Sequence, residues 1–136
     1  VEPFLVGSSV RSFIAQRLVR RLCPHCSEPG EHQDDELQRI GFPLEFASQI
    51  RRPVGCERCR NTGYAGRTAL YEICMMSTRM QELIQKRATG SDLRDLAIRE
   101  GMVPLRKSGW QKVSEGITSI AEVVRVTSNE VDILNE

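Results

Sequence analysis

The chain has 136 residues, with 19 basic and 18 acidic side chains, and 40% of its residues are hydrophobic. This length fits one domain or part of one, and the composition supports a modest core rather than disorder. The net charge of +1 removes the main electrostatic reason to expect a nucleic-acid-binding protein. No apolar run approaches the ~20 residues of a membrane-spanning helix, and no signal-peptide pattern opens the chain. Because the sequence starts at Val1 in the middle of a pattern, we expect a piece of a longer protein.

The first predicted element is a helix over residues 3–15, with apolar residues at helical spacing and Pro3 suited to the first turn. From about Ala15 the pattern changes to the alternation of a strand that runs to Cys23. The next segment, residues 27–55, begins polar and acidic. A short helix ended by Gly41 is predicted within it, and two later prolines suggest that the segment packs only lightly.

A second strand is predicted over residues 67–75. Alternate residues there are apolar, and Tyr71, Ile73 and Met75 share one face. Cys74 lies in this apolar run, so it is expected as a small buried hydrophobic residue rather than a ligand.

The remainder of the sequence reads as a series of helices. Ser77 is the predicted cap of a helix that stops near Gly90, and Ser91 the cap of another that Gly101 closes. A third helix opens at Pro104. A capping box, Ser119 with Glu122, begins a short last turn, and the chain is expected to fray beyond Thr127.

Four of the five cysteines form two Cys-x-x-Cys pairs, Cys23 with Cys26 and Cys56 with Cys59. Each pair lets one backbone turn point two thiolates at one ion, and two pairs supply the four soft ligands of a tetrahedral zinc site. Four cysteines leave no open coordination position, so the predicted zinc is structural. The 29 residues between the pairs exceed the ~15–20 of the commonest zinc pattern, so an insertion or small subdomain is expected there.

Residues beside the two pairs complete this prediction. Gly30 and Gly63 each follow a pair by four residues, where a tight turn would need positive φ. Histidine can also bind zinc, so His25 and His32 are alternative ligands. Because four cysteines are present, His25 is instead expected to be a loop residue beside the site. Arginines crowd both pairs and are expected to offset the charge of −2 on a zinc ion with four thiolates: Arg20, Arg21, Arg51, Arg52, Arg58 and Arg60.

The cysteines have three other interpretations. Two disulfides would suit a secreted small protein, but the odd cysteine count and the missing signal pattern argue against them. A redox site of thioredoxin type would need only one Cys-x-x-Cys pair. An iron centre on the same four sulfurs satisfies the same spacing.

Motifs for nucleotide chemistry are missing from this sequence. None of the ten glycines precedes a lysine, so there is no phosphate loop, and no Gly-x-Gly-x-x-Gly pattern is present. From the residues alone, the prediction is an α/β chain with a structural metal site and a helical tail.

Three segments in order carry a resemblance to a known family. They are Ala15 to Cys26 (AQRLVRRLCPHC), Gly55 to Thr68 (GCERCRNTGYAGRT) and Tyr71 to Ile73 (YEI). Together with the closing pattern from Gly101 to Thr127, they resemble the C-terminal part of the type II secretion and type IV pilus assembly ATPases. The general secretory pathway protein E branch is the nearest, with the pilus extension ATPases as the alternative. An interaction or nucleic-acid-binding zinc ribbon is a more distant alternative.

The resemblance implies the end of a RecA-like ATPase core at residues 1–22, a tetracysteine subdomain at 23–65, a core strand at 66–76, a helical subdomain at 77–128 and a frayed tail at 129–136. It implies a cytoplasmic hexamer, peripheral at the inner membrane through an assembly platform and other secretion components. That motor would use ATP and magnesium to drive assembly of pilin-like subunits. No nucleic-acid partner is implied.

The family's phosphate loop lies upstream of the matching segments, so this chain alone is expected to be inactive and to bind nucleotide weakly if at all. Arg17, Arg20 and Arg67 are candidates for phosphate contacts in the full-length ring, because arginine suits such contacts. The opposing interpretation is that these arginines pair with carboxylates or lie exposed on strands. A further hypothesis treats residues 27–55 as a docking surface for the platform or a sister subunit.

Overall fold

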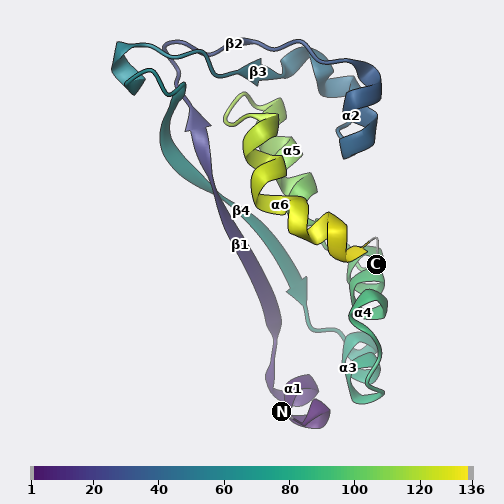
Figure 1. The fold of residues 1–136 in the computed structure, drawn as a ribbon. Helices are drawn as coiled ribbons and strands as arrows, with labels where there is room; N and C mark the ends of the chain where they lie inside the picture. Colours follow the sequence, from purple (N-terminus) through teal and green to yellow (C-terminus); the bar gives the residue numbers. More distant parts are fainter. Residues whose placement is uncertain (1, 135–136) are drawn as a thin grey trace. The chain divides into compact units, whose positions relative to one another are not determined.

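The computed structural model describes residues 2–134, with side chains described through Ser128. The chain divides into two compact units: unit 1 contains residues 1–16 and 71–104, and unit 2 contains residues 17–70 and 105–136. Two long strands, β1 (Ser12–Leu22) and β4 (Tyr64–Met75), pair with each other, and each contributes residues to both units (Figure 1). They run antiparallel: Cys23 N–H donates to Gly63 O beyond one end, and Met76 N–H donates to Arg11 O beyond the other.

Unit 1 adds three helices to its strand segments: α1 (Pro3–Ser9), α3 (Thr78–Gln85) and α4 (Gly90–Arg99). Its core is formed by Met80, Leu96 and Ala97, and partly buried residues on β4 and the helices pack against them. The Ser77 cap predicted for α3 is confirmed, because its hydroxyl accepts from Met80 N–H at 3.1 Å.

Two sequence predictions fail in unit 1. The predicted helix over residues 3–15 ends at Ser9, because Val10 is extended and Arg11 O accepts from Met76 N–H beside the strand pair. Strand pairing here outweighs the local helical spacing. The predicted cap Ser91 lies inside α4, and Thr89 is the cap instead: its hydroxyl accepts from Asp92 N–H.

Unit 2 contains the segment between the two cysteine pairs and the last two helices. The short strands β2 (Glu28–Pro29) and β3 (Arg51–Arg52) pair antiparallel, Glu28 opposite Arg52. Between them lie α2 (Asp34–Ile40) and a 3₁₀ helix, η1 (Leu44–Gln49), and a second 3₁₀ turn, η2 (Glu57–Cys59), carries the second pair. Gly41 ends α2 at φ 79°, as predicted.

Helices α5 (Leu105–Ser114) and α6 (Ile120–Leu134) complete unit 2. They pack closely because Gly109 of α5 presents no side chain toward Val123 of α6. The backbone of α6 is helical through Leu134, so the predicted short last turn is wrong. The tail predicted to fray, residues 129–136, has no described side chains.

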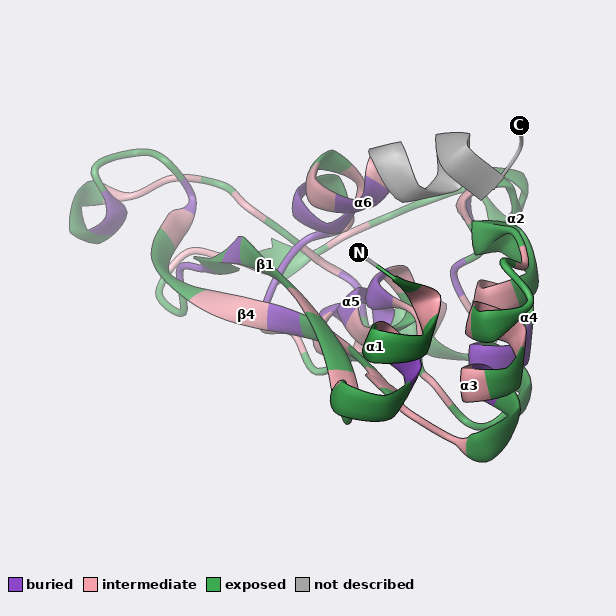
Figure 2. Cartoon of the chain, turned by 90° about the horizontal axis from the view of Figure 1, so that it is seen from below, coloured by how far each residue is buried: buried purple, intermediate pink, exposed green. Residues whose placement is uncertain are grey.

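The core of unit 2 corrects the expectation that residues 27–55 pack lightly. Three apolar residues of this segment, Leu37, Phe42 and Ile50, are 0–3% exposed. They pack in one cluster with residues of β1, β4, α5 and α6, and each of these elements has buried residues among half-buried and exposed ones (Figure 2). The prolines therefore interrupt secondary structure without preventing burial. Among residues 2–134, no helix is both long enough and apolar enough to cross a membrane.

Candidate metal centre

The structure brings all four predicted ligands together in unit 2. The sulfur atoms of Cys23, Cys26, Cys56 and Cys59 all lie within 4.8 Å of one another. Cys23 and Cys59 are buried, whereas Cys26 and Cys56 are half-buried. In the part of the chain that the structure describes, this is the cluster that can hold a metal ion.

The sulfur separations match a single tetrahedral ion. A tetrahedral site with metal–sulfur bonds of ~2.3 Å requires sulfur atoms about 3.8 Å apart. Three of the six separations are 3.8 Å for Cys23–Cys56, 3.8 Å for Cys26–Cys59 and 3.7 Å for Cys56–Cys59, and the other three are within 4.8 Å. These distances are far too long for S–S bonds, and all five cysteines are free thiols. Multi-iron clusters hold their thiolates further apart, so the geometry favours one ion.

Local backbone geometry aims the second pair at the centre. Arg60 and Asn61 both adopt left-handed backbone conformations directly after Cys59, which turns the chain back on itself. The Cys59 sulfur accepts from the N–H groups of Cys56 and Gly63, both at 3.2 Å. Cys26 receives a similar bond from Gly55 N–H at 3.3 Å. These amide donors stabilise thiolate sulfur, as metal ligands require.

Of the two glycines predicted to have positive φ beside the cysteine pairs, one does and one does not. Gly63 has φ 83°, as predicted, and a Cβ there would lie 2.5 Å from Pro53 Cβ. Gly30 is not among the positive-φ residues, so its prediction is wrong. It stands beside the β2–β3 pair instead, where its N–H donates to Ile50 O.

Two thiols of the cluster, Cys59 and Cys26, have pKa values that are shifted in opposite directions. Burial alone would raise the pKa of Cys59, but the two backbone N–H donors and the neighbouring thiols Cys56 and Cys26 lower it to about 6. For Cys26 the Gly55 N–H acts to lower the pKa, but burial and the three other thiols together raise it to about 11. The amide donors thus favour the thiolate form of Cys59, which is the form that binds a metal.

Three of the flanking arginines have defined partners near the centre. Arg51 donates to the backbone O and side-chain Oγ of Ser27, and Arg52 forms an exposed ion pair with Glu28. The Arg58 guanidinium contacts the His25 ring at 3.1–3.3 Å, so His25 lies in the loop beside the centre, outside the sulfur cluster. A site of four sulfurs with this surrounding fits zinc as a structural ion.

The candidate phosphate-contacting arginines lie on the strands. Arg17 is exposed on β1. Arg20 and Arg67 line a cavity of about 280 Å³ together with Thr62, Tyr64 and Gly66. Their phosphate contacts stay a prediction.

Arg20 pairs with a carboxylate, as the opposing interpretation expected, although the sequence did not identify Glu122 as the partner. Its Nε donates to Glu122 Oε1 at 2.7 Å, and its backbone N–H donates to Glu122 Oε2 at 3.1 Å. Glu122 is buried, at 2% exposure, although it was predicted only as part of a capping box. Ser119 does cap Glu122 N–H, but the Glu122 side chain turns to Arg20 and Arg125. The capping-box spacing gave no signal for this, because the partner is 102 residues away.

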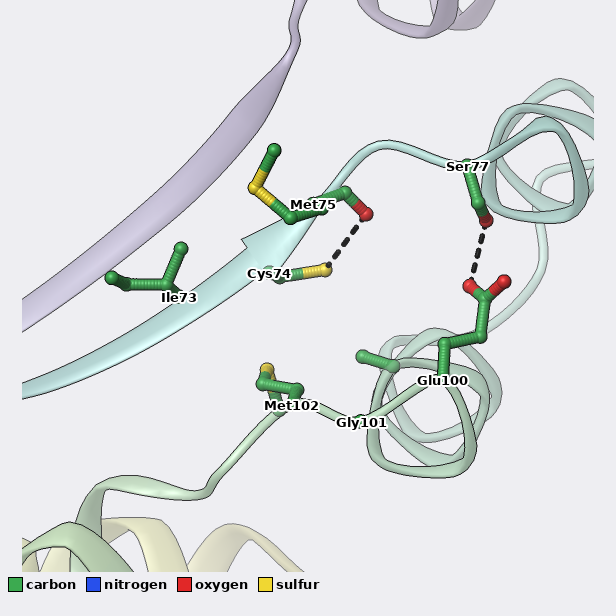
Figure 3. A pocket seen from close by; sticks show the side chains of 8 residues that line it. Ile73, Cys74, Met75, Ser77, Glu100, Gly101 and Met102 are labelled. Atoms are coloured by element: carbon green, nitrogen blue, oxygen red, sulfur yellow. Dashed lines mark hydrogen bonds between the residues drawn. The ribbon is translucent and has the colours of Figure 1, made fainter.

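The fifth cysteine, Cys74, lies in unit 1, where it lines a cavity of about 240 Å³ (Figure 3). Met102 lies on the opposite wall, and Ser77 Oγ donates to Glu100 Oε1 at 2.6 Å. Cys74 is half-buried rather than fully buried as predicted. Burial, with the charges of Glu100 and Glu72, raises the pKa of this thiol, and Cys74 lies outside the four-sulfur cluster.

With the fold and the sulfur cluster established, comparison with known proteins defines the class. Residues 1–125 match the type II/IV secretion system protein family. The chain belongs to this family.

Individual relatives come from both branches of the family. Over 128 residues the chain is 40% identical to the type IV pilus assembly ATPase TfpB of Acinetobacter baylyi, covering 93% of this chain and 22% of the relative. It is 41% identical over 130 residues to the type II secretion system protein E of Aeromonas hydrophila, covering 96% and 26%. It is 39% identical over 127 residues to the type II secretion system ATPase E of Vibrio cholerae, covering 93% and 25%. The chain thus spans about a quarter of the length of these relatives.

Proposed function

We propose that Cys23, Cys26, Cys56 and Cys59 hold a structural zinc ion. The observation that carries this is that the four sulfurs lie within 4.8 Å of one another, with three of their six separations at 3.7–3.8 Å, the edge length of a tetrahedral zinc–thiolate site. When bound, zinc supplies no reaction chemistry here, and its role is to fix the two backbone turns that carry the ligands.

Elemental analysis of protein purified without added metal tests this proposal. We expect about one zinc per chain, and a Cys56→Ser, Cys59→Ser variant is expected to retain none. The matched control is Cys74→Ser, which removes a thiol outside the cluster and is expected to keep the full content. A wild-type protein that contains iron, or no metal, would contradict the zinc assignment.

We further propose that the chain acts as the C-terminal part of a secretion ATPase that uses ATP hydrolysis to assemble pilin-like subunits. The relatives named as secretion and pilus assembly ATPases support this role. In the full-length protein we expect a hexamer that binds ATP and magnesium, located in the cytoplasm and held at the inner membrane by an assembly platform. We expect the chain alone to hydrolyse no ATP.

An uncovered apolar strand face supports a place at the end of a larger, RecA-like core. Tyr71, Ile73 and Met75 alternate along β4 and so share one face, and their exposures are 49%, 48% and 66%. A face this apolar is typical of an interface rather than a solvated surface. We propose that further strands or helices of the full-length protein cover it.

A domain swap distinguishes type II secretion, the favoured role, from type IV pilus extension. This chain replaces the matching segment of the Aeromonas hydrophila secretion protein E or of the Acinetobacter baylyi pilus ATPase TfpB, in cells that lack the native copy. We expect secretion to recover more fully than piliation. The same swaps with Cys56→Ser, Cys59→Ser test whether the metal site is required. Recovery of piliation alone would favour the pilus role, and recovery of neither would contradict the motor assignment.

A further inference from the structure

Both chain segments that flank the sulfur cluster contact the start of helix α6, which lies in the same unit. One segment is Arg20–Cys23, which contains the last residues of β1 and then the first ligand. The other is Gly63–Tyr64, which follows the last ligand, Cys59, and begins β4. Both segments that flank the cluster thus contact residues 117–122.

One bond between backbone groups and one from a side-chain hydroxyl to the backbone make the first attachment. Leu22 N–H, immediately before Cys23, donates to Ile117 O at 2.8 Å. Two residues earlier, Arg20 O accepts from the Thr118 hydroxyl at 2.7 Å. Thr118 is fully buried, so water does not compete for this bond.

The Glu122 carboxylate reinforces this attachment. It accepts from both the backbone N–H and the guanidinium of Arg20, and from Arg125 at 2.6 Å. Because the carboxylate is buried and bonded at both oxygens, it holds one orientation. The Arg20 guanidinium also lies 4.1 Å from the centre of the Tyr64 ring, which joins the two segments to each other.

The second attachment passes through Gly63 and Tyr64. Gly63 N–H donates to the Cys59 sulfur, and Gly63 O accepts from Cys23 N–H at 2.9 Å, so this residue touches a ligand of each pair. Directly after it, the Tyr64 hydroxyl bonds to the Ser119 hydroxyl at 2.8 Å. Ser119 is the residue that caps Glu122 N–H at the start of α6.

We propose that Glu122 and Tyr64 are positioning residues for the metal centre, and that the first turn of α6 and the bound ion stabilise each other. This inference rests on the proposed metal site. Neither side chain is a ligand. They act by holding the backbone of Cys23 and Gly63 so that the four sulfurs keep a spacing suited to one ion. The coupling is reciprocal: the free energy by which docked α6 strengthens metal binding equals the free energy by which the bound metal stabilises the docking of α6.

Metal affinity of the 136-residue chain tests this directly. Zn²⁺ affinity is measured by competition with a colorimetric chelator, and the ligand geometry is followed by the absorption spectrum of bound Co²⁺. We expect Glu122→Gln to lower Zn²⁺ affinity about tenfold, the lower end of the range for residues that orient metal ligands. Tyr64→Phe, which removes only the hydroxyl, is expected to lower it by a smaller factor, and both variants should alter the Co²⁺ spectrum.

Two controls separate positioning from general loss of stability. Glu28→Gln makes the same chemical change in the exposed ion pair with Arg52, two residues from Cys26, and is expected to leave affinity within about twofold. Val113→Ala destabilises the core of the same unit without touching these contacts, and is expected to leave the Co²⁺ spectrum unchanged. If Glu122→Gln fails to fold without metal, the Zn²⁺ affinity and Co²⁺ spectrum of Tyr64→Phe test the proposal instead.

Hydrogen exchange supplies the reciprocal measurement. Removal of Zn²⁺ is expected to speed exchange of the amides of residues 121–125 in α6, while those of α4 in unit 1 change little. Unchanged Zn²⁺ affinity and Co²⁺ spectra in both Glu122→Gln and Tyr64→Phe would overturn the inference and leave the metal site intact. A wild-type chain that binds neither ion would overturn both proposals.

Discussion

The ring of Phe42 meets the ring of Trp110 edge to face, with centroids 5.4 Å apart and planes at 77°. Phe42 belongs to the segment between the cysteine pairs, and Trp110 to helix α5. This contact explains why a polar, proline-interrupted segment is part of the core of unit 2.

Phe42→Ala should therefore destabilise the whole of unit 2. Removing a buried aromatic side chain costs roughly 3–5 kcal/mol of the free energy of unfolding. Trp110 is the one tryptophan in the chain, and it is 4% exposed, so its fluorescence emission should shift to the red as water reaches it. Phe46→Ala, at a half-exposed site of the same segment, is the control and should change stability far less. Equal losses in the two variants would contradict the packing role of Phe42.

Gly109 is predicted to be irreplaceable in α5. A Cβ there would lie 2.4 Å from Val123 Cγ1 and 3.2 Å from Leu70 Cδ1. Gly109→Ala should lower the free energy of unfolding by about 1–3 kcal/mol despite the better helix propensity of alanine. Gly90→Ala is the matched control, because Gly90 also lies in a helix but has open space around it. It should be neutral or stabilising in thermal denaturation, and a stable Gly109→Ala variant would show that α5 and α6 can separate without cost.

Gly63 is predicted to be required by the metal centre. It combines φ 83° with a close approach to Pro53, so an alanine there meets both backbone strain and a clash. Gly63→Ala should reduce the zinc content after dialysis against a weak chelator. Gly41→Ala shares the positive φ but has open space, so it carries only the strain, about 1 kcal/mol, and should keep its zinc. Full zinc retention by Gly63→Ala would refute this prediction.

The Glu122 carboxylate should make stability depend on pH. Burial acts to raise its pKa, but the bonds from Arg125 and Arg20 outweigh burial and lower the pKa in the folded state. A lowered folded-state pKa gives a stabilisation that is complete above the unfolded pKa of about 4.3 and is lost as the pH falls below it. In metal-free, reduced protein, the difference in unfolding free energy between wild type and Glu122→Gln should shrink from pH 6 to pH 3. A difference that stays constant with pH would contradict the charged state assigned to Glu122.

The sequence alone was enough to predict the sulfur cluster, because Cys-x-x-Cys spacing is a local property of one backbone turn. The same holds for β4, for the Ser77 cap, for the end of α2 at Gly41 and for the positive φ of Gly63, each of which depends on a few neighbouring residues. The motifs around the cysteines likewise sufficed for the family.

Tertiary structure decided the features that join distant residues. Residues 10–14 form extended structure because β4 supplies hydrogen-bond partners, although their spacing suits a helix. The burial of Phe42 depends on Trp110, and the role of Glu122 depends on Arg20, 102 residues away. Periodicity reports which side of an element is apolar, whereas the partner of a side chain is set by which elements the folded chain brings together.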